Sequence, residues 1–244
     1  KPRSELEARH FARTPAFSLV DVNNQSEVAF DTILTPRFGW QNGPNVALLD
    51  EIKKKQFNFS IVSKKPIFAL LPGSRKQEIN AILPNMLSIV DSFPDYQFII
   101  AGTKLFTDKY YNSLINDSNV ILIKDETYGL LDNAKFALVT SGTATLEAAL
   151  FKVPQVVCYK TSTISYHIAR SLVDLEYMSL VNLIMDRPVV AEFLQDDFTL
   201  ENLIPELADI MGPKRAKILA DYDELINKLG SSGASHRVAE IVLR

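Results

Sequence analysis

One segment of the sequence, Thr140 to Glu147, places a glycine and hydroxyl side chains directly after an apolar run. Gly142 removes the Cβ atom where a ligand would approach the backbone, and Ser141 and Thr143 add hydroxyl groups. A helix that begins near Thr143 would present unpaired N–H groups, which favour a phosphate or pyrophosphate. Glu147, one turn further on, is suited to paired sugar hydroxyls. An ordinary helix cap, with Ser or Thr at the N-cap and Glu in the first turn, explains these residues equally well.

A second glycine-bearing loop follows another apolar run, at Gly73, Ser74 and Arg75. Arginine carries a permanent cation with a planar fork of donors, so it suits the edge of a phosphate site. At that edge, Arg75 would offset negative charge that grows on a departing diphosphate. The alternative is an exposed, solvated Arg75–Lys76 pair.

Three polar residues stand among apolar ones further along the chain: Asn182, Glu192 and Gln195. Amide side chains both donate and accept hydrogen bonds, so they suit sugar hydroxyls or an N-acyl group. Helix capping and surface exposure explain these three residues equally well.

Other polar residues do not indicate a site. His10, His167 and His236 are far apart and lack the spacing of metal ligands, so we expect no metal site. Cys158 lies in an apolar run and is expected to be an inert core thiol. The Asp221-Tyr222-Asp223 segment matches an Asp-x-Asp pattern of metal–nucleotide sites, but its charged surroundings favour a solvated helix face.

Short apolar runs alternate with helical patterns from residue 66 onward, and these elements must position the two loops. Continuous apolar runs predict strands of a sheet covered on both faces. Alternation with short connections predicts an α/β fold, an open parallel sheet with helices on both faces. In such a sheet both glycine loops lie at the carboxyl edge, where ligands bind. The strands are expected at 67–71, 96–101, 120–123, 136–140 and 155–159, and helices at 79–92, 104–116, 127–133 and 145–151, with Pro84 in a first turn.

The composition and the ends of the chain complete this outline. The 244 residues carry 26 Lys plus Arg against 29 Asp plus Glu, so there is no basic excess for a nucleic-acid partner. We expect residues 61–244 to form the main domain, with 199–244 helical and interrupted at Gly212-Pro213. Residues 1–60 lack this alternation and are expected to be an extension, or a remnant of another domain and its linker. No Gly-x-Gly-x-x-Gly or Walker lysine loop occurs, which counts against dehydrogenases and P-loop NTPases.

Several of these segments together resemble the C-terminal domain of the lipid-A-disaccharide synthase family. The resemblance covers roughly residues 66–244 and rests on the segments 70–79, 140–148, 154–160 and 177–195, which occur in family order. The Ser-Gly-Thr-x-x-x-Glu element alone is shared by glycosyltransferases with two Rossmann-like domains (GT-B), whereas the Leu-Pro-Gly-Ser-Arg element narrows the choice.

This resemblance implies an inverting transferase that needs no metal or cofactor, because the UDP-sugar is itself a substrate. It would join the sugar of UDP-2,3-diacylglucosamine to 2,3-diacylglucosamine 1-phosphate, giving the β-1,6 lipid A disaccharide phosphate and UDP. It also implies a cytoplasmic location with peripheral contact to the inner membrane of a Gram-negative bacterium, and it is compatible with a homodimer. The implied substrate-binding residues are Gly73, Ser74, Arg75, Ser141, Gly142, Thr143, Ala144, Glu147, Asn182, Glu192 and Gln195.

The sequence also departs from the family. Members carry an N-terminal acceptor domain with a Gly-Glu-x-Ser-Gly-Asp opening, and that domain supplies the proposed aspartate base; neither is found here. We therefore expect part of a longer protein, which binds nucleotide but turns over slowly or not at all, and we name no catalytic base. The alternatives are an enzyme like UDP-N-acetylglucosamine 2-epimerase, a non-catalytic nucleotide-binding module, and an interaction domain without a ligand.

Overall fold

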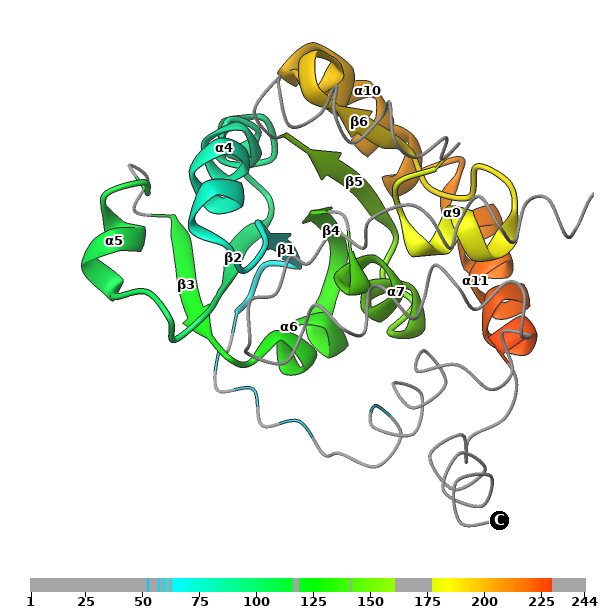
Figure 1. The fold of residues 1–244 in the computed structure, drawn as a ribbon, viewed down its shortest axis with the longest axis horizontal. Helices are drawn as coiled ribbons and strands as arrows, with labels where there is room; N and C mark the ends of the chain where they lie inside the picture. Colours follow the sequence, from blue (N-terminus) through cyan, green and yellow to red (C-terminus); the bar gives the residue numbers. More distant parts are fainter. Residues whose placement is uncertain are drawn as a thin grey trace, which may run out of the picture.

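The computed structural model describes residues 63–115, 119–140, 142–160 and 177–229, together with residues 52, 57, 59 and 61. Six parallel strands form one sheet (Figure 1). They are β1 (Ile67–Leu71), β2 (Gln97–Gly102), β3 (Val120–Lys124), β4 (Ala134–Thr140), β5 (Gln155–Tyr159) and β6 (Glu192–Leu194). The described helices are α4 (Lys76–Leu87), α5 (Asp108–Asn112), α6 (Thr127–Asn133), α7 (Thr143–Leu150), α9 (Leu180–Met185), α10 (Leu200–Met211) and α11 (Arg215–Leu229), with 3₁₀ turns η3 (Val90–Ser92) and η4 (Gln195–Asp197).

The strands are mostly apolar because helices cover both faces of the sheet. Successive residues of β1 point to opposite faces, so Phe68 and Leu70 join a core cluster that includes α4, α10 and α11. Ile67, Ala69 and Leu71 join a second cluster with buried leucines of α6. Figure 1 shows α4 and α10 on one side of the sheet and α6 and α7 on the other. The expected open parallel sheet is therefore confirmed.

The five expected strands are all present, and the structure adds a sixth. β6 pairs in parallel with β5 at the edge of the sheet, and the sequence pattern missed it because it has three residues and begins with a glutamate. The helix expected at 104–116 is shorter, since α5 begins at Asp108 and ends at Asn112. Gly212-Pro213 separates α10 from α11, as expected.

The expectation for Pro84 is wrong, because Pro84 lies inside α4 and not in a first turn. Proline has no N–H to donate to the carbonyl four residues earlier and its ring crowds that carbonyl, so it destabilises a helix interior. α4 forms nonetheless because it buries one face completely. Ile79, Ile82 and Met86 are all 0% exposed, and this burial outweighs the missing hydrogen bond.

The expected domain division near residue 60 stays a prediction. Of residues 1–60, only 52, 57 and 59 are among the described residues, and residues 230–244 lie outside them as well.

Candidate functional site

The two glycine loops meet where the order of the strands reverses. The sheet order is β3-β2-β1-β4-β5-β6, so the chain grows outward from β1 in one direction and from β4 in the other. β1 and β4 are hydrogen-bonded neighbours, and Leu71 pairs with Val139 close to their carboxyl ends. The loops of Gly73 and Gly142 therefore leave adjacent strands at one edge. In open α/β sheets this switch point is where ligands bind.

The turn between β4 and α7 requires a glycine. Gly142 has φ +124° and ψ −158°, a backbone conformation that residues with a Cβ atom rarely adopt. A Cβ atom placed on Gly142 would meet none of the described atoms within 4 Å, so the backbone is bare on this side. The Gly142 carbonyl accepts hydrogen bonds from the Thr145 amide (3.2 Å) and from Thr145 Oγ1 (2.8 Å).

The simple capping interpretation of this segment is wrong. Gly142 is the N-cap residue of α7, and no side chain caps the helix there. The first-turn amides of α7 therefore receive no N-cap hydroxyl or carboxylate, which leaves this helix end suited to an anion. Thr143 and Ala144 form its first two residues, and Glu147 lies in its second turn. Ser141 lies outside the described residues.

The loop after β1 is closed by an ion pair. Gly73 has φ +95°, and a Cβ atom there would lie 2.7 Å from Glu78 Oε2. Arg75 is the N-cap residue of α4 and is bonded twice to Glu78: its amide donates to Oε2 (3.3 Å) and its Nη1 donates to Oε1 (2.8 Å). The Arg75 side chain is 64% exposed, and Ser74 is exposed beside it. Because an exposed pair is weak, an anion at this edge would compete with Glu78 for the guanidinium.

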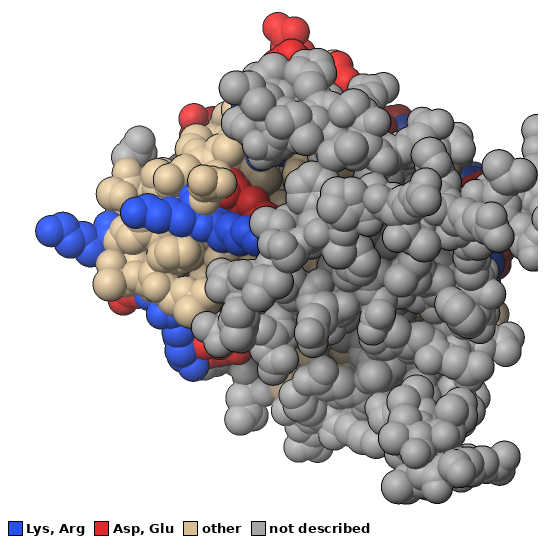
Figure 2. Space-filling view, viewed as in Figure 1, with Lys and Arg blue, Asp and Glu red and all other residues tan. Residues whose placement is uncertain are grey.

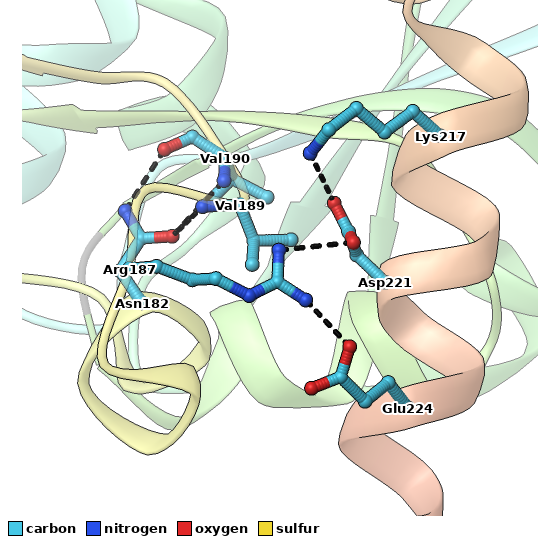
Figure 3. Close-up of polar contacts among 7 residues, drawn as sticks. All are labelled: Asn182, Arg187, Val189, Val190, Lys217, Asp221 and Glu224. Carbon is cyan, nitrogen blue, oxygen red and sulfur yellow. Dashed lines mark hydrogen bonds and ion pairs between the residues drawn. The ribbon is translucent and has the colours of Figure 1, made fainter.

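Asn182 and Glu192 are brought together, but their polar groups serve the protein itself. Asn182 is 1% exposed; its Oδ1 accepts from the amides of Val189 (2.8 Å) and Val190 (3.0 Å), as Figure 3 shows. Its Nδ2 donates to the Val190 carbonyl (2.9 Å) and to Glu192 Oε1 (2.7 Å). These four bonds use every hydrogen-bonding position of the amide. A sugar contact by Asn182 would therefore require one of these bonds to open.

The Glu192 carboxylate caps the beginning of α9. It accepts hydrogen bonds from the amides of Met178 (2.7 Å) and Ser179 (2.9 Å) and from Ser179 Oγ (2.7 Å). Ser179 is the N-cap residue of α9, and its hydroxyl accepts a hydrogen bond from the backbone N–H of Asn182. Gln195, which follows β6, has φ +51°. Whether these residues line a donor site stays a prediction.

An ion-pair cluster connects the loop after α9 to α11 (Figure 3). Arg187 donates to Asp221 (3.0 Å) and to Glu224 (2.7 Å), and Lys217 donates to the other Asp221 oxygen (2.8 Å). Burial by itself raises the pKa of Asp221, but the hydrogen bonds and charges of Lys217 and Arg187 outweigh it and lower that pKa. Asp221 is 8% exposed, so the expectation of a fully solvated face is wrong at this residue.

Cys158 is fully buried, and burial raises the pKa of its thiol well above the usual value. This confirms a core thiol.

Within the described ranges, no three His, Cys, Asp or Glu side chains are grouped as metal ligands would be. The described helices include none that is long and apolar enough to cross a bilayer. His10, His167 and His236 lie outside the described residues.

Basic side chains stand out on the face over α4 and α5 (Figure 2). Lys76 lies with its ammonium 5.7 Å from the ring centre of Tyr110, and the Lys104 side chain is 75% exposed. Leu105, between Lys104 and Phe106, is 77% exposed, the highest value among the large apolar side chains of the described residues.

The fold and the two switch-point loops define a Rossmann-like domain of the kind found in GT-B glycosyltransferases. The spinosyn rhamnosyltransferase SpnG, solved with thymidine diphosphate, superposes with a TM-score of 0.54 at 12% identity, over 77% of this chain and 48% of that one. The S. aureus MnaA–UDP structure superposes with a TM-score of 0.53 at 14% identity, over 82% of this chain and 51% of that one. At such identities the likeness concerns the fold alone.

The sequence identifies the family. The family model described as lipid-A-disaccharide synthetase matches residues 46–243, and the chain belongs to this family. The lipid-A-disaccharide synthase of Syntrophus aciditrophicus is 36% identical over 184 residues, which are 72% of this chain and 48% of that protein. That of Coxiella burnetii (strain CbuK_Q154) is 34% identical over 208 residues, 82% of this chain and 54% of that protein. The chain thus spans about half the length of the curated relatives it matches.

Proposed function

We propose that this chain provides the donor-nucleotide half of a lipid-A-disaccharide synthase. The complete activity would transfer 2,3-diacylglucosamine from UDP to the 6-hydroxyl of 2,3-diacylglucosamine 1-phosphate, with inversion at the anomeric carbon. The observation that carries the proposal is that the family match spans both glycine loops, which leave adjacent strands at the switch point of the sheet.

The proposed site uses two kinds of positive potential for the diphosphate of UDP. The backbone at Gly142, Thr143 and Ala144, with Ser141 before it, would bind the diphosphate at the start of α7. Arg75 would leave Glu78 and offset the charge that develops as UDP departs. The 6-hydroxyl of the acceptor must lose its proton as its oxygen bonds to the anomeric carbon and the bond to UDP breaks, so the reaction also needs a general base. We assign that base to the part of the relatives that this chain does not span.

The remaining predicted residues would complete the donor side. Glu147 would face the ribose hydroxyls, and Gly73 and Ser74 would keep the backbone of the first loop close to the ligand. The sugar of the donor would lie near Asn182, Glu192 and Gln195. The hydrogen bond between Asn182 and Glu192 would fix the loop between α9 and β6 on that side of the site. The UDP-sugar is a substrate in this scheme, and no metal or other cofactor is required.

The acylated substrates place the proposed reaction at a membrane surface. We propose peripheral contact with the cytoplasmic face of the inner membrane, since acyl chains stay in the bilayer. Support comes from Leu105, which is 77% exposed and directly follows the exposed Lys104.

Titration with UDP, followed by thermal unfolding, tests the proposal. A ligand that binds only the folded state raises the melting temperature once its concentration exceeds the Kd. We expect UDP to raise the melting temperature, and Arg75→Ala and Glu147→Ala to weaken that effect at least fivefold in apparent Kd. An unchanged melting temperature, or unchanged affinity in both variants, would contradict the proposed site. With the family's full-length protein, disaccharide plus UDP supports transfer, whereas an epimerised UDP-sugar would indicate the epimerase alternative.

A further inference from the structure

The turn at Gly142 needs contacts that hold it in place. Glycine adopts this region of φ and ψ without strain but many other regions as well, so its surroundings must select the one observed. Among the described residues, two hydrogen bonds to the Gly142 carbonyl hold this turn. Both come from Thr145, one from its amide and one, the shorter at 2.8 Å, from its hydroxyl.

The same hydroxyl also reaches a second element of the site. Thr145 Oγ1 donates to the Gly142 carbonyl and accepts a hydrogen bond from the amide of Leu180 (3.3 Å). Leu180 is the first residue of α9, whose N-cap Ser179 is bonded to Glu192. One buried hydroxyl therefore joins the turn after β4 to the helix start that Glu192 caps. Thr145 is 0% exposed, so water does not compete for these bonds.

The backbone of Thr145 is held from a third side. Its carbonyl accepts a hydrogen bond from Gln155 Nε2 (2.8 Å), and the same amide nitrogen lies 3.2 Å from the Tyr222 hydroxyl. Gln155 and Tyr222 are both 0% exposed. The first turn of α7 is thus tied to β5 and α11 as well as to α9, through polar groups inside an otherwise apolar core.

We propose that Thr145 is a positioning residue: its hydroxyl holds the Gly142 turn against α9 and so preorganises the first turn of α7 for a diphosphate. This inference rests on the function proposed above. Thr145 itself need not touch the nucleotide. It fixes the backbone whose amides would bind, and it makes the position of that backbone depend on the start of α9.

Thr145→Val tests the inference, because valine has nearly the same shape but no hydroxyl. We expect the Kd for UDP, measured by calorimetry on the whole chain, to rise about tenfold, the effect of losing about one net hydrogen bond. Thr145→Ser keeps the hydroxyl and should bind UDP within about threefold of the parent. Amide hydrogen exchange at Leu180 should become faster in Thr145→Val and not in Thr145→Ser.

Tyr222→Phe is the matched control, since it removes one buried hydroxyl of the same network but leaves both bonds to the Gly142 carbonyl. It should lower the melting temperature and leave the Kd for UDP unchanged. Equal weakening of UDP binding in Tyr222→Phe and Thr145→Val, or parent-like binding by Thr145→Val, would overturn the positioning role. A parent chain that does not bind UDP would instead overturn the proposed function.

The parent chain gives a second test should Thr145→Val fail to fold. If Thr145 connects the turn to α9, UDP should slow amide exchange at Leu180 together with Thr143 and Ala144. Slower exchange at Thr143 and Ala144 with no change at Leu180 would overturn the inference.

Discussion

Gly142 is the residue at which the backbone conformation itself can be tested. Gly142→Ala adds a methyl group that meets no described atom within 4 Å, so the change acts through φ alone. We expect it to lower the free energy of unfolding by about 1–3 kcal/mol and to weaken UDP binding at least tenfold, because the turn must shift. Urea unfolding and a UDP titration measure the two effects.

Gly212→Ala is the control for this prediction. Gly212 ends α10 with a negative φ of −121°, and a Cβ atom there would lie 3.3 Å from the Ala208 carbonyl oxygen, so alanine at this position crowds the end of α10 and leaves the Gly142 turn unchanged. It should bind UDP as the parent does. Parent-like stability and affinity in Gly142→Ala would mean that the turn does not need its positive φ.

At the same scale, the sequence predicted types of residue better than their partners. The turn at Gly142 was predictable because a glycine between a strand and a helix indicates a backbone conformation that other residues avoid. Asn182 was expected to contact a sugar, yet its amide is used by Val189, Val190 and Glu192, which become neighbours only through the fold. Thr145 was assigned only to a helix, since nothing in a helical pattern reveals a hydroxyl that bonds a residue 35 positions away.

At the scale of elements, the attachment of the α9–β6 loop to α11 should depend on pH. The contacts with Lys217 and Arg187 hold the folded-state pKa of Asp221 below the ordinary value of an aspartate, 3.8, so its ion pairs stabilise the fold above that pH. This stability is lost as the pH falls through the lower, folded-state pKa. We expect Asp221→Asn to be less stable than the parent at pH 7 and the difference to shrink below about pH 3.8. Urea unfolding across this range measures it.

Asp223→Asn is a suitable comparison, because Asp223 forms a pair with Lys152 in which both side chains are more than half exposed. That pair should contribute little at either pH. A difference between the parent and Asp221→Asn that stays constant from pH 7 to pH 2.5 would contradict an ionised Asp221 as the cause.

Strands were predictable to within a residue or two where burial made them wholly or mostly apolar, as in β1 and β5. β6 was not predicted because an edge strand of three residues has no continuous apolar run. The position of Pro84 was predicted wrongly because the low helix propensity of proline favours the first turn of a helix. In the structure, burial of one face of α4 stabilises a helix that contains Pro84 in its interior.

At the scale of the molecule, strand alternation predicted the parallel sheet, but only the order of the strands brings the two glycine loops together. That order places β1 beside β4, although β2 and β3 lie between them in the sequence. Because β1 and β4 are parallel neighbours, the loops that follow them leave the sheet at one edge. Two weak motifs therefore become one candidate site.

The surface over α5 carries the last prediction, which concerns how the whole molecule meets a membrane. Leu105 and Leu200 are the two exposed large apolar side chains of the described residues, at 77% and 38%. Leu105 directly follows Lys104, whereas Leu200 is followed by Glu201. We therefore expect Leu105→Glu to reduce sedimentation with vesicles of anionic phospholipid about tenfold, through lost apolar burial and charge repulsion. Leu200→Glu should sediment like the parent. Equal loss in both variants would indicate a general effect of added charge, and no loss in Leu105→Glu would place the membrane contact on another part of the protein.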